Sequence, residues 1–492
     1  MSGDPQKPVL WTAAEAAAAT RGKAKGEWTA TGVSIDSRTV ESGDLFIAIE
    51  GPTHDGHVFV GDALAAGATA VVIARPSETL DGYFDPAKLL LVTDTMAALE
   101  DLGRAARART AARIAGVTGS VGKTTTKEAL KLALGAVAGE NAVTATQGNL
   151  NNHWGLPLSL ARMPADTAYG VFEMGMNHPG EIAPLSRMCR PHAAIVTTVA
   201  ETHSAFFKSL SEIADAKAEI FAGLEPEGVA ILNRDNVMYA HLAAAARQQG
   251  CRTVSFGADE DSDWRLADIN LHADCSDVRV ALRGRTLEFL LGVPGRHMAL
   301  NMLAVLAAVD ALGADVDRAA AALAGMRSIA GRGERHHVRF ADGSFELIDE
   351  SYNASPTSMR AAVEVLGNAV PAVGGRRIAV LGDMLELGQQ AEKLHADMAS
   401  SLREAGIDLV FTAGQYMASL WEALPANMRG GHATTAEKLV PIVSAAIGVG
   451  DVVMVKGSLG SRTRQIVDAL LALGDGNGNG AGAEPRRMAS GG

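Results

Sequence analysis

The sequence predicts an α/β protein of three domains: a small first domain, a central domain with a parallel sheet, and a last domain of the doubly wound, Rossmann-like type. Three observations support this prediction. The chain has 492 residues, about three times the length of a typical domain. From residue 113, near-continuous apolar runs alternate with helical patterns, which is typical of a parallel sheet covered on both faces. The same alternation starts again near Arg332.

The first domain is predicted over residues 1–108. Short apolar runs predict strands at residues 44–49 and 70–73, and the pattern between them predicts a helix over residues 59–66. Glycine-bearing turns separate these elements, which indicates a small α/β domain.

The central domain is predicted over residues 109–329. Its strands are expected at the apolar runs that begin at residue 113 and at residues 169–173, 193–199 and 228–233. After Val254 the runs become shorter and alternate with polar residues, which favours an antiparallel extension of the sheet. A strongly helical pattern follows over residues 299–314.

The last domain is predicted over residues 330–473. Its strands are expected at residues 345–348, 377–381, 409–413 and 452–455. Each of these runs precedes a helical pattern, as a doubly wound sheet requires. Residues 474–492 are rich in glycine, asparagine and alanine, and this tail is predicted to be disordered because it has too little apolar surface to bury.

Composition narrows the function further. The formal net charge of -12 disfavours a general nucleic-acid or membrane surface. The sequence has neither a secretory leader pattern nor a run of about 18 apolar residues, so a cytoplasmic protein without membrane insertion is expected. The three cysteines, Cys189, Cys251 and Cys275, have no C-x-x-C spacing and indicate neither a disulfide framework nor a zinc site.

The most informative segment follows the apolar run at residues 113–116. It consists of Gly119, Ser120, Val121, Gly122, Lys123, Thr124 and Thr125, and a helical pattern follows it. Glycines let the backbone curl around phosphates, a helix N-terminus attracts anions, and a lysine and a threonine supply a charge and a hydroxyl for Mg²⁺. The segment therefore predicts a nucleoside triphosphate site. Val117 stands where the general motif has its first glycine, which indicates a subclass of phosphate loops.

Polar residues after apolar strands are further candidates, because ligands of open α/β sheets bind beyond the carboxyl ends of the strands. Glu173 ends one predicted strand and His203 follows the next. A carboxylate and an imidazole form a sensible partial ligand set for Mg²⁺ on a triphosphate, and a solvated carboxylate with a capping histidine is the alternative. Lys217 lies in an amphipathic helical pattern, which by itself indicates only a solvated side chain.

The last domain offers two more groups of this kind. Asp349 and Glu350 follow a predicted strand and are candidates for positioning a metal, a ribose or an amine. Lys456 and Ser458 follow the last strand and offer contacts to an anionic substrate, with a surface lysine in a turn as the alternative.

The first domain has one candidate group, Asp36, Ser37 and Arg38. Two interpretations of Arg38 are equally supported. Its guanidinium either contacts a phosphate or pairs with a neighbouring acid.

Together these motifs resemble the Mur ligases of peptidoglycan synthesis over about residues 28–470. The ATP loop of that family also lacks the first glycine, which accounts for Val117. Four further motifs resemble the branch that adds D-alanyl-D-alanine, at residues 148–152, 173–178, 349–354 and 382–388. The branch that adds diaminopimelate or lysine carries an Asn-Pro-Arg motif in its last domain, and this sequence has none.

The resemblance implies roles for individual residues. The phosphate-loop residues would hold ATP, Asn301 would contact the adenine, and Arg332 would contact the nucleotide. The implied ligands of two Mg²⁺ ions are Thr124, Glu173, His203 and a carbamylated Lys217, and the implied catalytic residues are Lys123, His203 and Lys217. The chain departs from the family pattern at Met298 and Glu350, where the family usually has asparagine and aspartate.

The resemblance also implies the substrates. Asp36, Ser37 and Arg38 match the family's uridine diphosphate motif, so the first domain would bind the uridine nucleotide. The other implied substrate contacts are Asn151, Asn152, Glu350, Tyr352, Asn353, Lys456 and Ser458. The implied reaction joins D-alanyl-D-alanine to a UDP-N-acetylmuramoyl tripeptide through an acyl phosphate, with ATP and Mg²⁺. A monomer that binds no nucleic acid is expected.

Two other classes of protein remain open at this point. A folylpolyglutamate synthase-like ligase would share the ATP machinery but lack a separate uridine-binding first domain, so residues 36–56 discriminate. An ATP-binding regulatory module would not need Glu173, His203 and Lys217 together.

Overall fold

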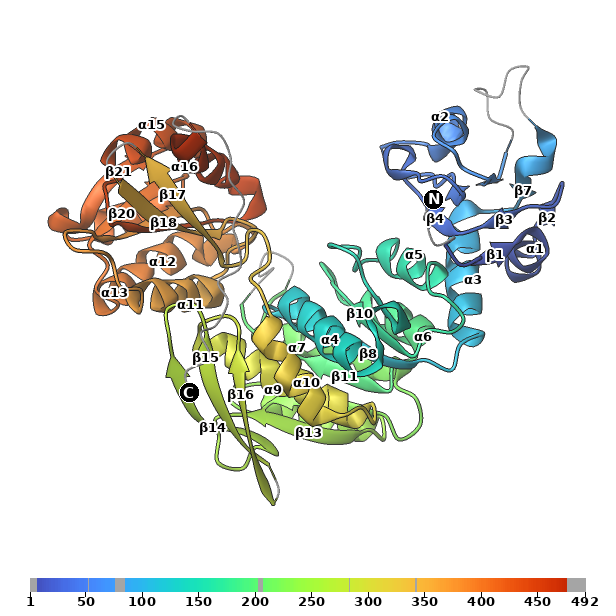
Figure 1. The fold of residues 1–492 in the computed structure, drawn as a ribbon, viewed down its shortest axis with the longest axis horizontal. Coiled ribbons are helices and arrows are strands. Elements are labelled where there is room, and N and C mark those ends of the chain that lie inside the picture. Colours follow the sequence, from blue (N-terminus) through green and yellow to red (C-terminus); the bar gives the residue numbers. More distant parts are fainter. Residues whose placement is uncertain are drawn as a thin grey trace, which may run out of the picture. The chain divides into compact units, whose positions relative to one another are not determined.

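The structure is a computed structural model, and it describes residues 7–51, 53–75, 85–201, 207–282, 284–340 and 343–475 (Figure 1). The chain divides into two compact units, residues 1–326 and 327–492. The first unit contains two main sheets and the second contains one. The domain bounds at residues 108 and 329 stay a prediction. None of the described helices is both long and apolar enough to cross a membrane.

The first sheet lies in the N-terminal part of the chain and has the strand order β2-β7-β6-β5-β4. Its members are β2 (Lys23–Ala24), β4 (Gly32–Ser34), β5 (Asp44–Ile47), β6 (Ala70–Ile73) and β7 (Leu89–Leu91). Only the β2–β7 pair is antiparallel. A separate pair joins β1 (Trp11–Thr12) to β3 (Thr29–Ala30), and the helices are α1 (Ala13–Thr20), α2 (Val60–Ala65) and α3 (Thr95–Ala108).

The central sheet has nine strands in the order β16-β15-β14-β13-β12-β11-β8-β10-β9. The parallel part comprises β8 (Arg113–Thr118), β9 (Val143–Ala145), β10 (Tyr169–Glu173), β11 (Ala193–Val196), β12 (Val229–Asn233) and β13 (Arg252–Gly257). The extension comprises β14 (Trp264–Leu271), β15 (Ser276–Leu282) and β16 (Arg285–Leu291). β14 is parallel to β13, and the antiparallel pairing begins between β14 and β15.

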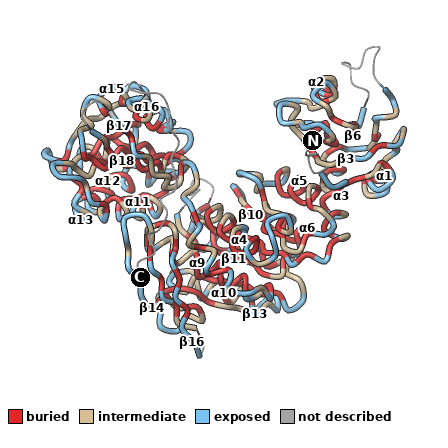
Figure 2. The backbone as a smooth tube through the Cα atoms, in the orientation of Figure 1, coloured by how far each residue is buried: buried red, intermediate tan, exposed pale blue. Residues whose placement is uncertain are grey.

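Helices cover both faces of the central sheet. One core includes residues of α4 (Lys123–Ala138), α9 (Arg296–Ala311) and α10 (Val316–Ala322). The other includes residues of α5 (Gly155–Ala161), α6 (Ile182–Cys189), α7 (Leu210–Ala218) and α8 (Tyr239–Gln248). The central strands β8, β10, β11 and β12 are buried along nearly their whole length (Figure 2), as parallel strands with two covered faces must be. In β15 and β16, buried and exposed residues alternate instead.

The sheet of the second unit has the order β17-β18-β22-β19-β20-β21. Its strands are β17 (Glu334–Phe340), β18 (Gly343–Glu350), β19 (Arg377–Gly382), β20 (Leu409–Ala413), β21 (Arg429–Ala433) and β22 (Val452–Lys456). Only β17 is antiparallel to its neighbour. One face packs on α11 (Pro356–Gly367), α12 (Ala391–Ala396), α13 (Met398–Glu404) and α14 (Met417–Ala423), and the other on α15 (Ala436–Ala446) and α16 (Arg464–Asp475).

The predicted α/β class and the doubly wound last sheet are confirmed. Val254 was expected to precede the antiparallel extension directly, but it lies in β13, which is parallel to β12. The helix expected over residues 299–314 is α9, which begins and ends three residues earlier. Helix α16 runs to Asp475, past the expected start of the tail, and residues 476–492 lie outside the described part of the chain.

His192 accepts a hydrogen bond from the central strand β8 and should make the stability of the protein depend on pH. Its Nδ1 accepts a hydrogen bond from the Ile114 N–H at 3.0 Å, which requires an unprotonated Nδ1. Burial lowers the pKa of His192 to about 4, and Arg113 contributes further. Because the unfolded chain takes up this proton near the ordinary pKa, the stabilisation is complete above pH ~6.5 and is lost as pH falls toward 4.

We therefore expect the Tm of the native protein to fall more steeply between pH 6.5 and pH 5 than the Tm of His192→Asn. Asparagine keeps an acceptor near the position of Nδ1 but has no proton to gain. Thermal unfolding at constant ionic strength measures both slopes. Parallel curves would show that His192 does not set this dependence.

Candidate functional site: the phosphate loop and its surroundings

The phosphate loop connects β8 to α4, as the sequence predicts. Gly122 has φ +86°, in the left-handed region, and precedes the first residue of α4. Gly119 lies so close to the residue that follows β11 that an added Cβ would lie 1.9 Å from Thr197 Oγ1. Helix α4 has 16 residues and no side-chain cap at its N-terminus, so the first-turn N–H groups and the helix dipole can act on an anion.

The loop is fixed by the segment that follows β11. The Ser120 N–H donates to Thr198 O at 2.8 Å, and the Ser120 hydroxyl donates to Ala200 O at 3.0 Å. Thr197 Oγ1 donates to Val121 O at 2.5 Å. Inside the loop, Lys123 Nζ donates to Gly119 O at 2.8 Å. These bonds give the loop a fixed shape before any ligand is bound, which is the preorganisation a phosphate site needs.

Asn301 lies directly against the loop. A Cβ on Gly122 would lie 3.0 Å from both amide atoms of Asn301, which comes from the first turns of α9. The structure therefore places Asn301 beside the phosphate loop, and its contact with the adenine stays a prediction. Met298, which departs from the family pattern, packs partly buried against the central core. The methionine that replaces the family's usual asparagine therefore contributes an apolar side chain to the packing of this core.

Glu173 is the last residue of β10 and is only 2% exposed. It lies beside the loop, because β10 pairs with β8 in the register Glu173↔Val117. Asn151 Nδ2 donates to Glu173 Oε1 at 2.7 Å, whereas the buried Oε2 has no hydrogen-bond partner within the described part of the chain. A buried carboxylate oxygen without a partner is costly. Because Mg²⁺ prefers oxygen ligands, it fits this position.

Lys217 lies on α7 and is only 2% exposed. The solvated side chain that its helical pattern alone indicates is therefore wrong. Burial, and then the charge of Lys123, hold the pKa of Lys217 well below its usual range. None of the described carboxylates pairs with it. Burial and the nearby positive charge of Lys123 thus both disfavour the charged ammonium form of this side chain. His203, the remaining predicted ligand, lies outside the described residues.

The segment after β9 contributes residues that the sequence analysis missed. Thr146 Oγ1 accepts a hydrogen bond from the Glu173 N–H at 3.1 Å, and Lys127 Nζ donates to Thr146 O at 2.8 Å. In this structure Asn151 donates to Glu173, and its contact with the substrate stays a prediction. Asn152 accepts from the Gly155 N–H at 2.9 Å, at the start of α5.

In the N-terminal sheet, Arg38 pairs with Asp36. Its Nε donates to Asp36 Oδ1 at 2.9 Å and its Nη2 to Oδ2 at 2.7 Å. These hydrogen bonds hold the pKa of Asp36 below its usual range. Of the two interpretations of Arg38, the structure therefore shows the ion pair with a neighbouring acid. Ser37 opens the short turn after β4 beside this pair.

In the second unit, Glu350 and Lys456 form one ion pair. They end the neighbouring strands β18 and β22 in direct register. Lys456 Nζ donates to Glu350 Oε2 and to Asn353 O, both at 2.9 Å. Ser458 Oγ accepts from the Leu385 N–H at 3.0 Å and donates to Ala354 O at 3.3 Å. Glu350, the second departure from the family pattern, therefore has a defined partner.

Arg332 also belongs to the second unit. Its guanidinium lies 4.1 Å from the centroid of the Tyr352 ring, a cation–π contact. Tyr352 N donates to Gly331 O at 3.1 Å, which holds the turn that carries Arg332 next to β18. The predicted residues Arg332, Glu350, Tyr352, Asn353, Lys456 and Ser458 thus gather beyond the carboxyl ends of β18 and β22.

Replacing Lys456 with methionine should lower the stability of the protein by about 2–3 kcal/mol, because the Glu350 carboxylate and the Asn353 carbonyl would each lose a buried donor. The Lys456 side chain is 3% exposed. Urea unfolding followed by circular dichroism measures the loss. Lys438→Met, at an exposed lysine of the same unit, is the matched control and should leave the curve unchanged. Equal curves for the two variants would contradict the prediction.

Comparison with known proteins identifies the family of this chain from three matches along its length. The family model "Mur ligase family, catalytic domain" matches residues 29–109, "Mur ligase middle domain" matches residues 117–309, and "Mur ligase, glutamate ligase domain" matches residues 331–459. The first of these matches includes the segment that distinguishes the Mur ligases from a folylpolyglutamate synthase-like ligase.

Individual relatives agree with the family models. The UDP-N-acetylmuramoyl-tripeptide--D-alanyl-D-alanine ligase of Rickettsia prowazekii is 34% identical over 437 residues, which is 89% of this chain and 94% of that protein. The crystal structure of MurF from Acinetobacter baumannii has a TM-score of 0.81 at 30% identity, covering 94% of this chain and 99% of that one.

A third relative was solved with a nucleotide bound. The MurF ligase of Thermotoga maritima in complex with ADP has a TM-score of 0.74 at 27% identity, covering 90% of this chain and 98% of that one. With the phosphate loop, the buried carboxylate and the buried lysine all in place, this chain belongs to the Mur ligase family.

Proposed function

We propose that this chain is an ATP-dependent ligase that joins D-alanyl-D-alanine to a UDP-N-acetylmuramoyl tripeptide in the cytoplasmic synthesis of peptidoglycan precursors. The observation that carries the proposal is the combination at the central sheet: a phosphate loop at the start of α4, a buried Glu173 with one oxygen that has no partner among the described residues, and a buried Lys217. The relatives that cover most of the chain are named for this reaction.

Enzymes of this family use ATP and Mg²⁺. Bound ATP supplies the phosphoryl group that activates a carboxylate, and Mg²⁺ offsets the charge where two anions meet. The phosphate loop and α4 would hold the phosphates, with Lys123 at the terminal ones. Two Mg²⁺ ions would be held by Thr124, Glu173, His203 and a carbamylated Lys217, and Asn301 and Arg332 would contact the nucleotide.

The residues of the chain act by position and charge, and no enzyme nucleophile is required. The terminal carboxylate of the tripeptide attacks the γ-phosphorus and ADP leaves, giving an acyl phosphate. The dipeptide amine then attacks the acyl carbon, loses a proton and displaces phosphate. Lys123, which already contacts the loop, stabilises the negative charge that gathers at the phosphate during the first step.

The remaining residues would bind the two substrates. Asp36, Ser37 and Arg38 would contact the uridine diphosphate, where Arg38 would exchange part of its bond to Asp36 for a phosphate. Asn151 and Asn152 would face the substrate from the central sheet. Glu350, Tyr352, Asn353, Lys456 and Ser458 would bind substrate groups at the second unit, where the Glu350–Lys456 pair offers both a carboxylate and an ammonium group. A monomer suffices for this arrangement.

The test is phosphate release by the purified protein with ATP, Mg²⁺ and UDP-muramoyl tripeptide, with and without D-alanyl-D-alanine. Release that requires both substrates, together with an amide-linked pentapeptide product by mass spectrometry, would establish the assignment. Release stimulated instead by a folate or by single amino acids would keep the ATP site and overturn the substrate assignment.

A further inference from the structure

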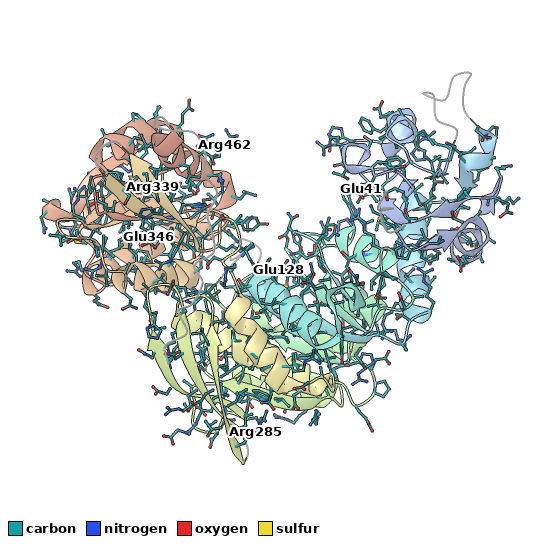
Figure 3. All side chains as sticks on the ribbon, in the orientation of Figure 1. Glu41, Glu128, Arg285, Arg339, Glu346 and Arg462 are labelled. Carbon is teal, nitrogen blue, oxygen red and sulfur yellow. The ribbon has the colours of Figure 1, made fainter. Side chains whose placement is uncertain are left out.

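Lys127 is a fully buried lysine that the proposed reaction does not use. It lies on α4, one turn after Lys123, and its side chain is 0% exposed. Its Nζ donates to Thr146 O at 2.8 Å and to Gly148 O at 3.3 Å, and it lies 2.7 Å from Glu128 Oε1. Figure 3 shows Glu128 near the N-terminal end of α4. Burying an ammonium group is costly unless it is hydrogen-bonded, so the partners of Lys127 show which parts of the chain it holds together.

Both carbonyl partners belong to the segment from Thr146 to Asn151, which follows the edge strand β9 and has no strand or helix of its own. Lys127 is therefore a cross-link between this irregular segment and the helix that starts at the phosphate loop. The ladder between β9 and β10 ends at Ala145. Beyond it, backbone hydrogen bonds hold the two ends of the segment, from Thr146 N to Val171 O at 3.0 Å and from Gly175 N to Asn151 O at 2.8 Å, and Lys127 adds bonds to the Thr146 and Gly148 carbonyls.

The same segment holds Glu173 at two points. Thr146 Oγ1 accepts from the Glu173 backbone N–H at 3.1 Å, and Asn151 Nδ2 donates to Oε1 at 2.7 Å. With Oε1 occupied, the buried Oε2 is the oxygen left for a ligand. The orientation of this carboxylate thus depends on a segment that Lys127 helps to hold against α4.

We propose that Lys127 is a positioning residue for the metal site: it fixes residues 146–151 against α4, and through them it aims Glu173 Oε2 at the cation. The inference rests on the proposed role of Glu173 as a metal ligand. Partners that orient a metal ligand typically contribute about 10–100-fold to metal affinity, although they never touch the metal.

The experiment measures binding, not turnover. The affinity for Mn²⁺, a paramagnetic substitute for Mg²⁺, is measured by electron paramagnetic resonance with ADP present, and ADP affinity is measured separately in EDTA. For Lys127→Met we expect Mn²⁺ affinity to fall at least about 10-fold and ADP affinity in EDTA to stay within about twofold. Lys131→Met, at an exposed lysine one turn further along α4, is the matched control and should change neither.

Lys127→Gln retains a donor for one carbonyl and should show an intermediate loss of Mn²⁺ affinity, and it carries the test if the methionine variant does not fold. Because Lys127 acts through Glu173, adding Lys127→Met to Glu173→Gln should weaken Mn²⁺ binding no further. Additive losses would overturn the proposal. The proposal would also be overturned if Lys127→Met lowered the Tm but left Mn²⁺ affinity unchanged while Glu173→Gln weakened Mn²⁺ binding. If Glu173→Gln also leaves Mn²⁺ binding unchanged, the proposed role of Glu173 fails as well.

Discussion

Glu173→Gln is expected to lower kcat at least ~100-fold, which corresponds to about 2.7 kcal/mol of lost transition-state stabilisation. Glutamine has nearly the same shape, so Oε1 can still accept from Asn151. The amide NH₂ then replaces Oε2, the Glu173 oxygen that has no partner among the described residues, and presents donors where a cation needs an acceptor. Initial rates over a range of Mg²⁺ concentrations measure both the loss of kcat and the higher half-saturating Mg²⁺.

The control for this prediction is Glu140→Gln, which makes the same chemical change at an exposed residue of the same unit. It should leave kcat and the Mg²⁺ dependence unchanged. A kcat for Glu173→Gln within threefold of the native value would show that the unpartnered oxygen has no part in the reaction. Circular dichroism of both variants separates this result from misfolding.

The strands that the sequence predicts lie mainly in the interiors of the sheets. β10, for example, was expected at residues 169–173 and has these bounds, because a strand covered on both faces must be almost entirely apolar. The strands that were missed include β9, β17 and β21, and each is the edge of its sheet. An edge strand bonds to a neighbour on one side only and tolerates polar residues, so β17 is a strand despite two histidines and two arginines.

Some residues of the candidate site could likewise be predicted from the sequence and others could not. Spacing along the chain predicts the phosphate loop and places Glu173 at a strand end, because both depend on local pattern. Lys127 could not be found in this way, since most helical lysines are solvated and its carbonyl partners lie in a segment about twenty residues later. The helical pattern around Lys217 likewise did not predict its burial, and only the family resemblance singled this lysine out as a functional residue.

Lys217→Met is also expected to abolish most of the activity, by at least ~100-fold, if a carbamate at this position completes the metal site. Burial, and then the charge of Lys123, hold the pKa of Lys217 well below its usual range, which favours the neutral amine that attacks CO₂. The amine loses a proton as the N–C bond forms, and the product is an anion. Kinetic assays and a ¹³C-bicarbonate NMR signal for the carbamate provide the two measurements.

Carbamylation reverses the electrostatics of this position. In the unmodified protein, protonation of Lys217 would place a second buried positive charge near Lys123, which is one reason that its pKa is lowered. A carbamate would instead be attracted to Lys123 and to Mg²⁺, so bound metal should favour the modification. Removing CO₂ and bicarbonate should therefore slow the native enzyme and the Lys131→Met control but leave the residual rate of Lys217→Met unchanged. Equal sensitivity of all three would exclude Lys217 as the site where CO₂ acts.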